Sequence, residues 1–334
     1  MEVELEAFEN YKPNNAYDSQ APSIKRAFQV WRQEALVRAS MVETGETDWA
    51  VDIGFENIER APKSITSTNN EIYLLVADTI WHPELRKKEV RRALSLAIDC
   101  QTLMETLYEG LLECYGNISQ EGTVGITPEN SAPYPYDPVM ARQLLEDAGY
   151  DPANEVIIHA RVGRVYRDAE LMEAVITMWR DVGVNARLQV LEESKAREAR
   201  RSGCGQYAPE AHTCLNQPPP APWGASTHYY ESGTSNESLD FQRQALLRNS
   251  CGNVNSRVCD PSPGGLEEKI RDANATPLGP ERIRKMEEIA TIVHNEYYFY
   301  PFFQNVSVYG LAENLEWTAR YDPRTRVNTM SFSQ

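Results

Sequence analysis

Apolar residues recur at helical spacing in residues 83–150, the most regular part of the chain. The apolar positions of the first helix fall on one face: Val90, Ala93, Leu94, Ala97 and Ile98. Asp99 follows, and its carboxylate can cap a second helix that ends at Gly110. A third helix begins with Asp137 as its N-cap and Pro138 in its first turn, and Gly149 supplies its left-handed stop. The pattern therefore predicts three helices, with an irregular segment before the third.

Alternating apolar and polar residues predict strands on both sides of a further helix. Residues 155–162 alternate, residues 168–182 carry a helical pattern, and residues 184–191 alternate again. A strand, helix and strand with such short connections form a βαβ unit, in which the strands are parallel and the crossover is right-handed. Residues 72–77 are apolar at successive positions, which predicts a strand buried on both faces.

The remaining segments divide into short regular elements and one long irregular region. Alternation in residues 1–21 and 48–53 predicts short strands, residues 264–273 predict a helix, and residues 297–309 predict an aromatic strand. The last clear helix begins at Pro280, and its inward positions are Ile283, Met286, Ala290 and Val293. Residues 202–265 are rich in Gly, Pro, Ser and Asn with little periodicity, and an irregular region this long is usually functional.

Composition excludes several classes of protein. Charged residues make up 25% and hydrophobic residues 41% of the 334 positions, which is typical of a globular chain. The formal net charge of -16 disfavours binding to nucleic acid, because phosphate backbones are repelled. No apolar run approaches the about 20 residues that a membrane-spanning helix needs.

The cysteines and the first residues point to different compartments. Cys251 and Cys259 lie close together in a polar, irregular segment, and so do Cys204 and Cys214. Both pairs are candidates for local disulfides, which persist outside the cytosol, with free thiols as the alternative. We expect Cys100 and Cys114, in or beside helices, to be buried thiols. The first residues show no signal peptide, which by itself is typical of a cytoplasmic protein.

No catalytic, cofactor or metal motif emerges from the sequence. The chain has no Gly-x-Ser-x-Gly elbow and no phosphate-binding loop with its Lys and Ser/Thr partners. The nearest approach to a metal set is Cys204, His212, Cys214 and His228, whose spacing matches no zinc pattern. We therefore predict no catalytic residue, no metal site and no cofactor.

Two motifs in residues 83–150 resemble those of the solute-binding proteins of ABC importers, family 5, which capture oligopeptides, dipeptides and nickel chelates. The first motif has a proline, then V-R-x-A-L-x-x-A-I-D: Pro83, Val90, Arg91, Ala93, Leu94, Ala97, Ile98 and Asp99. The second reads Y-D-P-x-x-A-x-x-L-L-x-x-A-G-Y: Tyr136, Asp137, Pro138, Ala141, Leu144, Leu145, Ala148, Gly149 and Tyr150. The resemblance covers nearly the whole chain. Both motifs form the scaffold of the fold and contain no nucleophile, paired carboxylates or phosphate-binding loop.

The resemblance implies a two-lobed α/β fold of the periplasmic-binding-protein type (type II) with an incomplete first lobe. Residues 1–78 would form the C-terminal part of lobe I, residues 79–300 lobe II, and residues 301–334 the return to lobe I. By analogy residues 22–44 form a strand followed by a helix, where periodicity alone permits one helix. Because the family's first segment is missing, we expect a C-terminal portion of a longer protein in which Met1 is not the natural start.

The resemblance also places the ligand against the irregular region 202–265. Aromatic faces with a few polar groups are suited to gripping a small organic ligand. The candidate ligand-binding residues are Tyr207, Trp223, Tyr229, Tyr230, Glu231, Asn236, Glu237 and Asp240. In peptide binders of the family an acidic side chain here pairs with the peptide's amino terminus, and Glu231, Glu237 and Asp240 are the candidates. Cys259 falls near an aromatic position of the family, which favours a Cys251–Cys259 bridge.

The function implied is capture of a peptide or similar small solute and its delivery to an ABC permease in the membrane, with no catalysis. The expected protein is a bacterial monomer in the periplasm or another extracytoplasmic space, associated with the membrane through its transporter. Two alternatives remain open. One is a metal-dependent hydrolase that uses His212, His228 and neighbouring acids, and the other is the solute-sensing domain of a regulator.

Overall fold

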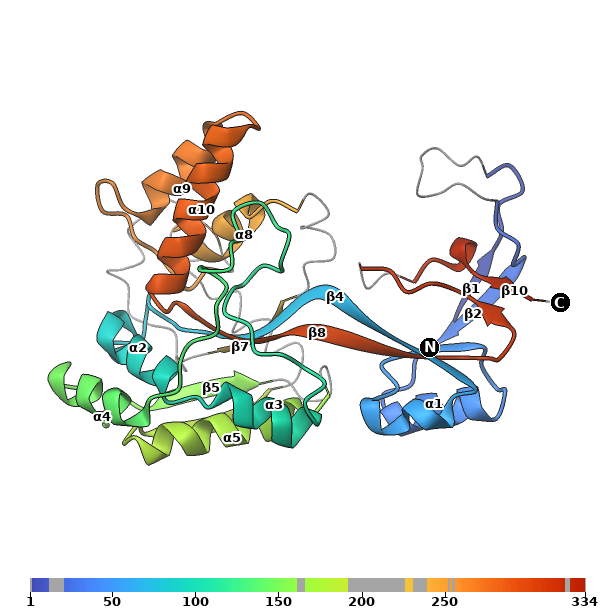
Figure 1. Cartoon of the computed structure of the whole chain (residues 1–334), viewed down its shortest axis with the longest axis horizontal. Coiled ribbons are helices and arrows are strands. Elements are labelled where there is room, and N and C mark those ends of the chain that lie inside the picture. The colour runs from blue at the N-terminus through green and yellow to red at the C-terminus, as the bar shows by residue number, and fades with distance from the viewer. Residues whose placement is uncertain are drawn as a thin grey trace. The chain divides into compact units, whose positions relative to one another are not determined.

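The computed structural model divides the chain into two compact units. It describes residues 2–11, 21–160, 166–191, 226–230 (as backbone), 239–251, 253, 256–321 and 325–333. Unit 1 comprises Met1–Asn69 and Val306–Gln334, and unit 2 comprises Asn70–Asn305. The chain passes from one unit to the other within two long strands, β4 (Lys63–Val76) and β8 (Phe299–Leu311) (Figure 1). The lobe limits expected from the sequence, 78 and 300, stay a prediction, and the two units divide instead after Asn69 and after Asn305.

Unit 1 combines short strands with one helix. Strand β1 (Glu2–Glu6) pairs antiparallel with β2 (Arg26–Val30), and α1 (Ala35–Glu43) and β3 (Trp49–Val51) follow. The strand-then-helix prediction for residues 22–44 is thus confirmed. A second antiparallel pair joins β9 (Leu315–Glu316) and β10 (Ser331–Phe332). The aromatic rings of Trp49, Tyr309 and Trp317 pack together in the core of this unit.

A six-stranded mixed sheet runs in the order β3-β8-β4-β7-β5-β6. Strand β5 (Val156–Ala160), helix α5 (Asp168–Asp181) and strand β6 (Ala186–Val190) form the predicted βαβ unit, with β5 and β6 parallel. Every residue of β5 is buried, so both of its faces are covered, although its alternating sequence suggested one exposed face. The burial follows from its position between β7 and β6, with helices on both sides of the sheet (Figure 1).

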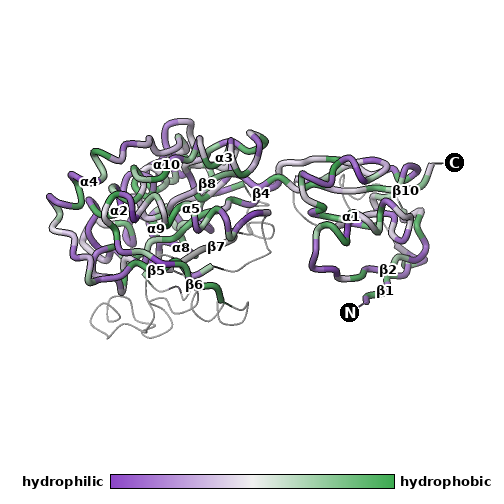
Figure 2. Tube along the Cα trace, turned by 90° about the horizontal axis from the view of Figure 1, so that it is seen from below, coloured by the Kyte–Doolittle hydropathy of each residue, from purple (hydrophilic) through white to green (hydrophobic). Residues whose placement is uncertain are grey.

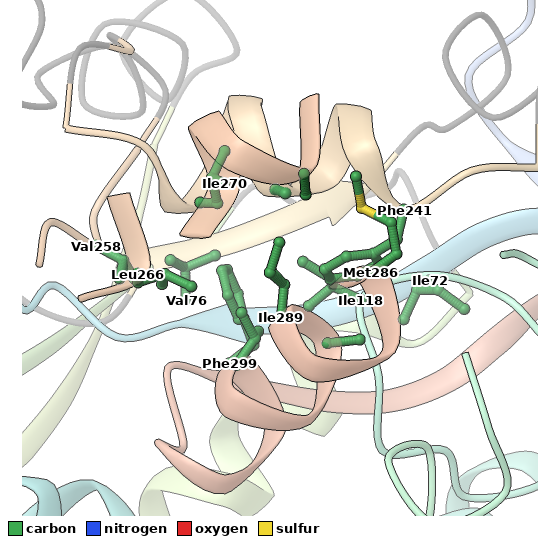
Figure 3. Packing of buried hydrophobic residues seen from close by; sticks show 14 of the residues in the cluster. Ile72, Val76, Ile118, Phe241, Val258, Leu266, Ile270, Met286, Ile289 and Phe299 are labelled. Carbon is green, nitrogen blue, oxygen red and sulfur yellow. The ribbon is translucent and has the colours of Figure 1, made fainter. Parts of the chain in front are cut away.

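The hydrophobic cluster in Figure 3 lies between β4 and the helices α8 (Gln242–Asn249), α9 (Leu266–Ala275) and α10 (Pro280–Asn295). Alternate residues of β4 contribute Ile72, Leu74 and Val76 to it. On α10 the buried apolar positions are Met286, Ile289, Ala290 and Val293. The prediction that Ile283 faces inward is wrong, because its side chain is 41% exposed, and Ile289 takes the inward position.

The capping predictions in residues 83–150 are confirmed. The carboxylate of Asp99 accepts a hydrogen bond from the Thr102 backbone N–H (3.1 Å) at the start of α3 (Cys100–Tyr108). The carboxylate of Asp137 accepts one from the Met140 N–H (2.8 Å) at the start of α4 (Pro138–Asp147). These bonds satisfy backbone donors that have no partner within their helices. The capping residues in the sequence therefore determine where these two helices begin.

Arg91 of α2 (Lys88–Leu96) explains the polar position in the first motif. Its guanidinium is buried, donates to the Glu296 carbonyl (2.8 Å) and pairs with the Glu296 carboxylate (3.1 Å). It also donates to the Leu85 carbonyl (3.0 Å) and lies 4.7 Å from the centroid of the Tyr298 ring. A planar cation can make all these contacts at once, so Arg91 joins α2 to the C-terminal end of α10.

Two elements occur where the sequence predicted an irregular region. Residues 202–265 were expected to lack regular structure, but β7 (Ser226–Tyr230) and α8 lie within them. Strand β7 has no alternating pattern and gains its backbone hydrogen bonds from β4. Ala245 is the one apolar residue among the buried positions of helix α8, beside Gln244 and Asn249, so its hydrophobic period is weak. Long-range pairing and packing therefore determine both elements.

The expectation that Cys100 and Cys114 are free thiols is wrong, because they form a disulfide with a Cα–Cα distance of 6.1 Å. Cys100 begins α3, and Cys114 lies in an isolated bridge to Phe303 of β8. The chain turns back after α3, so both cysteines contact β8. Local periodicity does not reveal that the chain turns back here. Cys204 and Cys214 lie outside the described residues.

None of the helices in the described residues combines the length and the apolar character needed to cross a membrane. Apolar and polar residues are interleaved along the trace in Figure 2.

We predict that peptide mapping without reduction recovers the Cys100 and Cys114 peptides joined together, because the fold holds both cysteines at bonding distance. The measurement is mass spectrometry of a digest of the protein purified from an oxidising compartment. Alkylation of both cysteines by iodoacetamide in the denatured, unreduced protein would contradict the assignment.

Candidate ligand-binding region

Strand β7 brings the predicted ligand-binding region into the centre of the sheet. It pairs antiparallel with β4, with Tyr230 opposite Ile72 and Tyr229 opposite Tyr73. Its first residue, Ser226, bridges in parallel to His159 of β5. Strand β7 is thus paired with β4 along its length and with β5 at Ser226.

Most of the predicted ligand-binding residues fall outside the described structure. Those residues are Tyr207, Trp223, Glu231, Asn236 and Glu237. Tyr229 and Tyr230 are placed by their backbone on β7, and Asp240 is described with its side chain. The structure therefore leaves the roles of Tyr229, Tyr230 and the five undescribed residues as predictions.

Asp240 is part of a buried ion pair. Its side chain lies at the start of α8 in a residue that is 7% exposed, and its Oδ2 accepts from Arg282 Nε (3.1 Å) and Nη2 (3.0 Å). Its Oδ1 accepts from the Gln242 backbone N–H (2.9 Å). Arg282 also donates to the carbonyls of Ala273 and Thr276, each at 3.1 Å. Both carboxylate oxygens are thus engaged within the protein, which gives Asp240 a structural role between α8, α9 and α10.

A second buried ion pair holds the segment after α8. Arg257 Nη1 donates to Asp78 Oδ2 at 2.9 Å, and both side chains are almost fully buried. The other oxygen of Asp78 accepts from the backbone N–H groups of Ile80 (3.2 Å) and Trp81 (2.9 Å). The Thr79 hydroxyl donates to the Arg257 carbonyl (2.8 Å). The pair therefore fixes this segment to the chain directly after β4.

A disulfide closes the same segment. Cys251 and Cys259 are bonded with a Cα–Cα distance of 4.6 Å, which confirms the bridge that the family resemblance favoured. The Cys251 backbone N–H donates to the Glu267 carboxylate of α9 (2.8 Å). Within the closed loop the Ser256 hydroxyl contacts the carbonyls of Arg248 (2.8 Å) and Val258 (2.6 Å). The bridge therefore holds Arg257 in the register that reaches Asp78.

Sequence reasoning missed both buried ion pairs. Arg282 lies on the buried face of a helix among apolar residues, and Asp78 comes shortly after the buried end of β4. A charge at such a position signals a buried partner, because an unpaired charge in the interior is very costly. The partners, however, are far away in the sequence, so the pairing itself required the fold.

Two buried histidines of unit 2 have lowered pKa values. Burial lowers the pKa of His159 on β5 to about 4, and the charges of Arg257 and Arg187 lower it further. Burial also lowers the pKa of His82, although the Glu155 carbonyl opposes that shift. His82 Nδ1 accepts from the Leu85 N–H (3.3 Å), so its Nε2 donates to the Glu155 carbonyl (3.1 Å). Both rings therefore favour their uncharged forms.

Solved structures show which fold this is. CtaP, an ABC transporter substrate-binding protein from Listeria monocytogenes, superposes with a TM-score of 0.78 at 15% identity, covering 100% of this chain and 64% of that one. AppA, an oligopeptide-binding protein from Bacillus subtilis solved with a nonapeptide, gives a TM-score of 0.71 at 13% identity, with 100% and 64% coverage. The fold is thus the two-lobed α/β fold of ABC substrate-binding proteins.

Sequence comparison gives the family. The model for bacterial extracellular solute-binding proteins, family 5 (middle), matches residues 1–235, so the chain belongs to that family. A probable di/tripeptide-binding protein of Pseudomonas aeruginosa is 24% identical over 317 residues, which is 89% of this chain and 53% of that protein. The glutathione-binding protein GsiB of Salmonella typhimurium is 25% identical over 184 residues, 51% of this chain and 33% of that protein. The chain spans about half the length of the first of these relatives.

We predict that acidification destabilises the protein through His159. The pKa of this ring is near 4 when folded and about 6.5 when unfolded, so between these values the unfolded state binds more protons. The free energy of unfolding should therefore fall, by at most about 3 kcal/mol from this group, as the pH drops from 7 to 4. Urea unfolding at several pH values measures it, with His159→Gln as the comparison. An equally steep pH dependence in the variant would contradict the assignment.

Proposed function

We propose that this chain belongs to a solute-binding protein that captures a peptide or similar small solute between two lobes and delivers it to an ABC permease. The observation that carries the proposal is the family match over residues 1–235, joined to a fold that follows ABC substrate-binding proteins along the whole chain. Relatives named as di/tripeptide-binding and a neighbour solved with a nonapeptide support a peptide as the ligand class. The protein would act as a monomer in the periplasm or another extracytoplasmic space.

We propose that the ligand meets the segment that leaves β7. Tyr229 and Tyr230 stand at the end of that strand, and Glu231, Asn236 and Glu237 follow. Tyr207 and Trp223 precede the strand and would add aromatic surface. Since the carboxylate of Asp240 is occupied by Arg282, we assign the contact with a peptide's amino terminus to Glu231 or Glu237.

Binding of this kind needs no catalytic group in the chain. The ligand would be held by desolvation against aromatic faces and by satisfying its charged ends. Within the described residues, no three His, Cys, Asp or Glu side chains gather closely enough to hold a metal ion. Nothing observed thus favours the hydrolase alternative, whose His212 lies outside the described residues.

We predict that the full-length gene product binds short peptides with a free amino terminus. Isothermal titration calorimetry with dipeptides and tripeptides should detect binding, and acetylation of the peptide should weaken it at least about tenfold, about 1.4 kcal/mol, because the ion pair with the acidic residue is lost. Native mass spectrometry of the purified protein should reveal a co-purified solute.

Variants separate the two acidic candidates. Glu231→Gln or Glu237→Gln should reproduce the loss caused by acetylation, whereas Glu288→Gln, on the exposed face of α10, should leave affinity unchanged. Absence of binding for every peptide tested, or release of hydrolysed peptide, would contradict the proposed function.

A further inference from the structure

Helix α8 carries its leucines on the face that is turned away from the core. At its start Phe241 enters the apolar cluster of Figure 3, and along the helix the polar side chains of Gln244 and Asn249 are fully buried. Leu246, by contrast, is 37% exposed, and Leu247 is partly exposed. A surface helix normally turns its apolar residues inward and its polar residues to solvent. On α8 this order is partly reversed, so its outer face needs a separate explanation.

An open groove lies over this outer face. Its volume is about 630 Å³, and small-molecule sites typically measure about 300–1,000 Å³. Its described wall is one stripe of α8 together with residues that follow the helix: Gln242, Arg243, Leu246, Leu247, Ser250 and Asn253. Residues four apart on a helix follow one another along the same face. The two leucines and Arg243 therefore border the same space.

Arg243 brings an unpaired positive charge to this groove. It is exposed, and it makes no hydrogen bond or ion pair in the part of the chain that the structure describes. The chain has 49 acidic and 33 basic side chains, so carboxylates to pair with are plentiful elsewhere. A guanidinium can bind a carboxylate through two parallel hydrogen bonds, and neighbouring apolar side chains shield such a pair from water. The groove thus suits a molecule that carries a carboxylate next to an apolar group.

We propose that the groove on α8 binds the carboxyl-terminal residue of the peptide ligand. Arg243 pairs with the terminal carboxylate, and Leu246 and Leu247 contact a large apolar side chain on that last residue. This inference rests on the proposed function, in which Glu231 or Glu237 meets the peptide's amino terminus. The segment that carries those acids leads directly into α8, so the two charged ends of a short peptide meet opposite charges on one continuous stretch of chain. The ligand class is then a short peptide with a free carboxyl terminus and an apolar last residue.

The test is calorimetric titration of the full-length gene product with trileucine, its carboxyl-terminal amide and trialanine. The wild type should bind trileucine at least about tenfold more tightly than the amide, because the amide cannot form the charged pair. Arg243→Gln should abolish this preference for the acid. Leu246→Ser should keep it but reduce the preference for trileucine over trialanine at least about threefold, because less apolar surface is buried.

Helix α10 offers matched controls. Arg284 is exposed and unpaired among the described residues, and Ile283 is 41% exposed. Arg284→Gln and Ile283→Ser should therefore leave both preferences unchanged, and equal midpoints of urea unfolding show that each variant is folded.

The outcomes separate this inference from the proposed function. Peptide binding with equal affinity for acid and amide, or an acid preference that Arg243→Gln retains, would overturn the groove as the site of the carboxyl terminus and leave the proposed function standing. Failure of trileucine to bind when other peptides do would have the same meaning. Absence of binding for every peptide would overturn both.

Discussion

The buried ion pair between Asp78 and Arg257 is the interaction on which the arrangement around the candidate ligand-binding region depends. Asp78 follows β4, the strand that pairs with β7, and Arg257 lies in the disulfide-closed loop after α8. Together with Asp240–Arg282 at the start of α8, it ties both ends of this helix to the body of unit 2. The segment between β7 and α8, which carries Glu231, Asn236 and Glu237, therefore has a paired strand before it and an anchored helix after it.

Buried charge pairs serve specificity better than stability. Desolvation cancels much of their attraction, so apolar residues of the same shape could give an equal or greater free energy of unfolding. A charge pair, however, tolerates only one register, because a shifted chain would bury two unpaired charges. The loop that closes at Cys251–Cys259 has few apolar residues with which to define its position. In such a loop an ion pair supplies the register that hydrophobic packing cannot.

The parts that the sequence predicted correctly are those governed by local rules. Asp99 and Asp137 cap their helices as expected, and the period of residues 155–191 gives the βαβ unit. The errors arise where distant contacts decide. Strand β7 exists because β4 pairs with it, and Cys100 meets Cys114 because both approach β8. Of the candidate site, spacing left the Cys251–Cys259 bridge and free thiols as alternatives, and the family resemblance favoured the bridge that the structure shows. The occupation of Asp240 by Arg282 could not be predicted, since the two lie in different elements.

The chain belongs to a family of solute-binding proteins, and the two buried ion pairs hold the described segments on either side of α8. Hydrogen exchange of the β7 amides, Ser226–Tyr230, tests this explanation most directly. Replacing Arg257 by Met leaves Asp78 buried without its partner, so these amides should exchange at least about tenfold faster, which corresponds to about 1.4 kcal/mol of local stability. Lys269→Met, which removes an exposed pair with Glu288, should leave their exchange unchanged. Equal exchange of β7 in the Arg257→Met variant and the wild type would contradict the account.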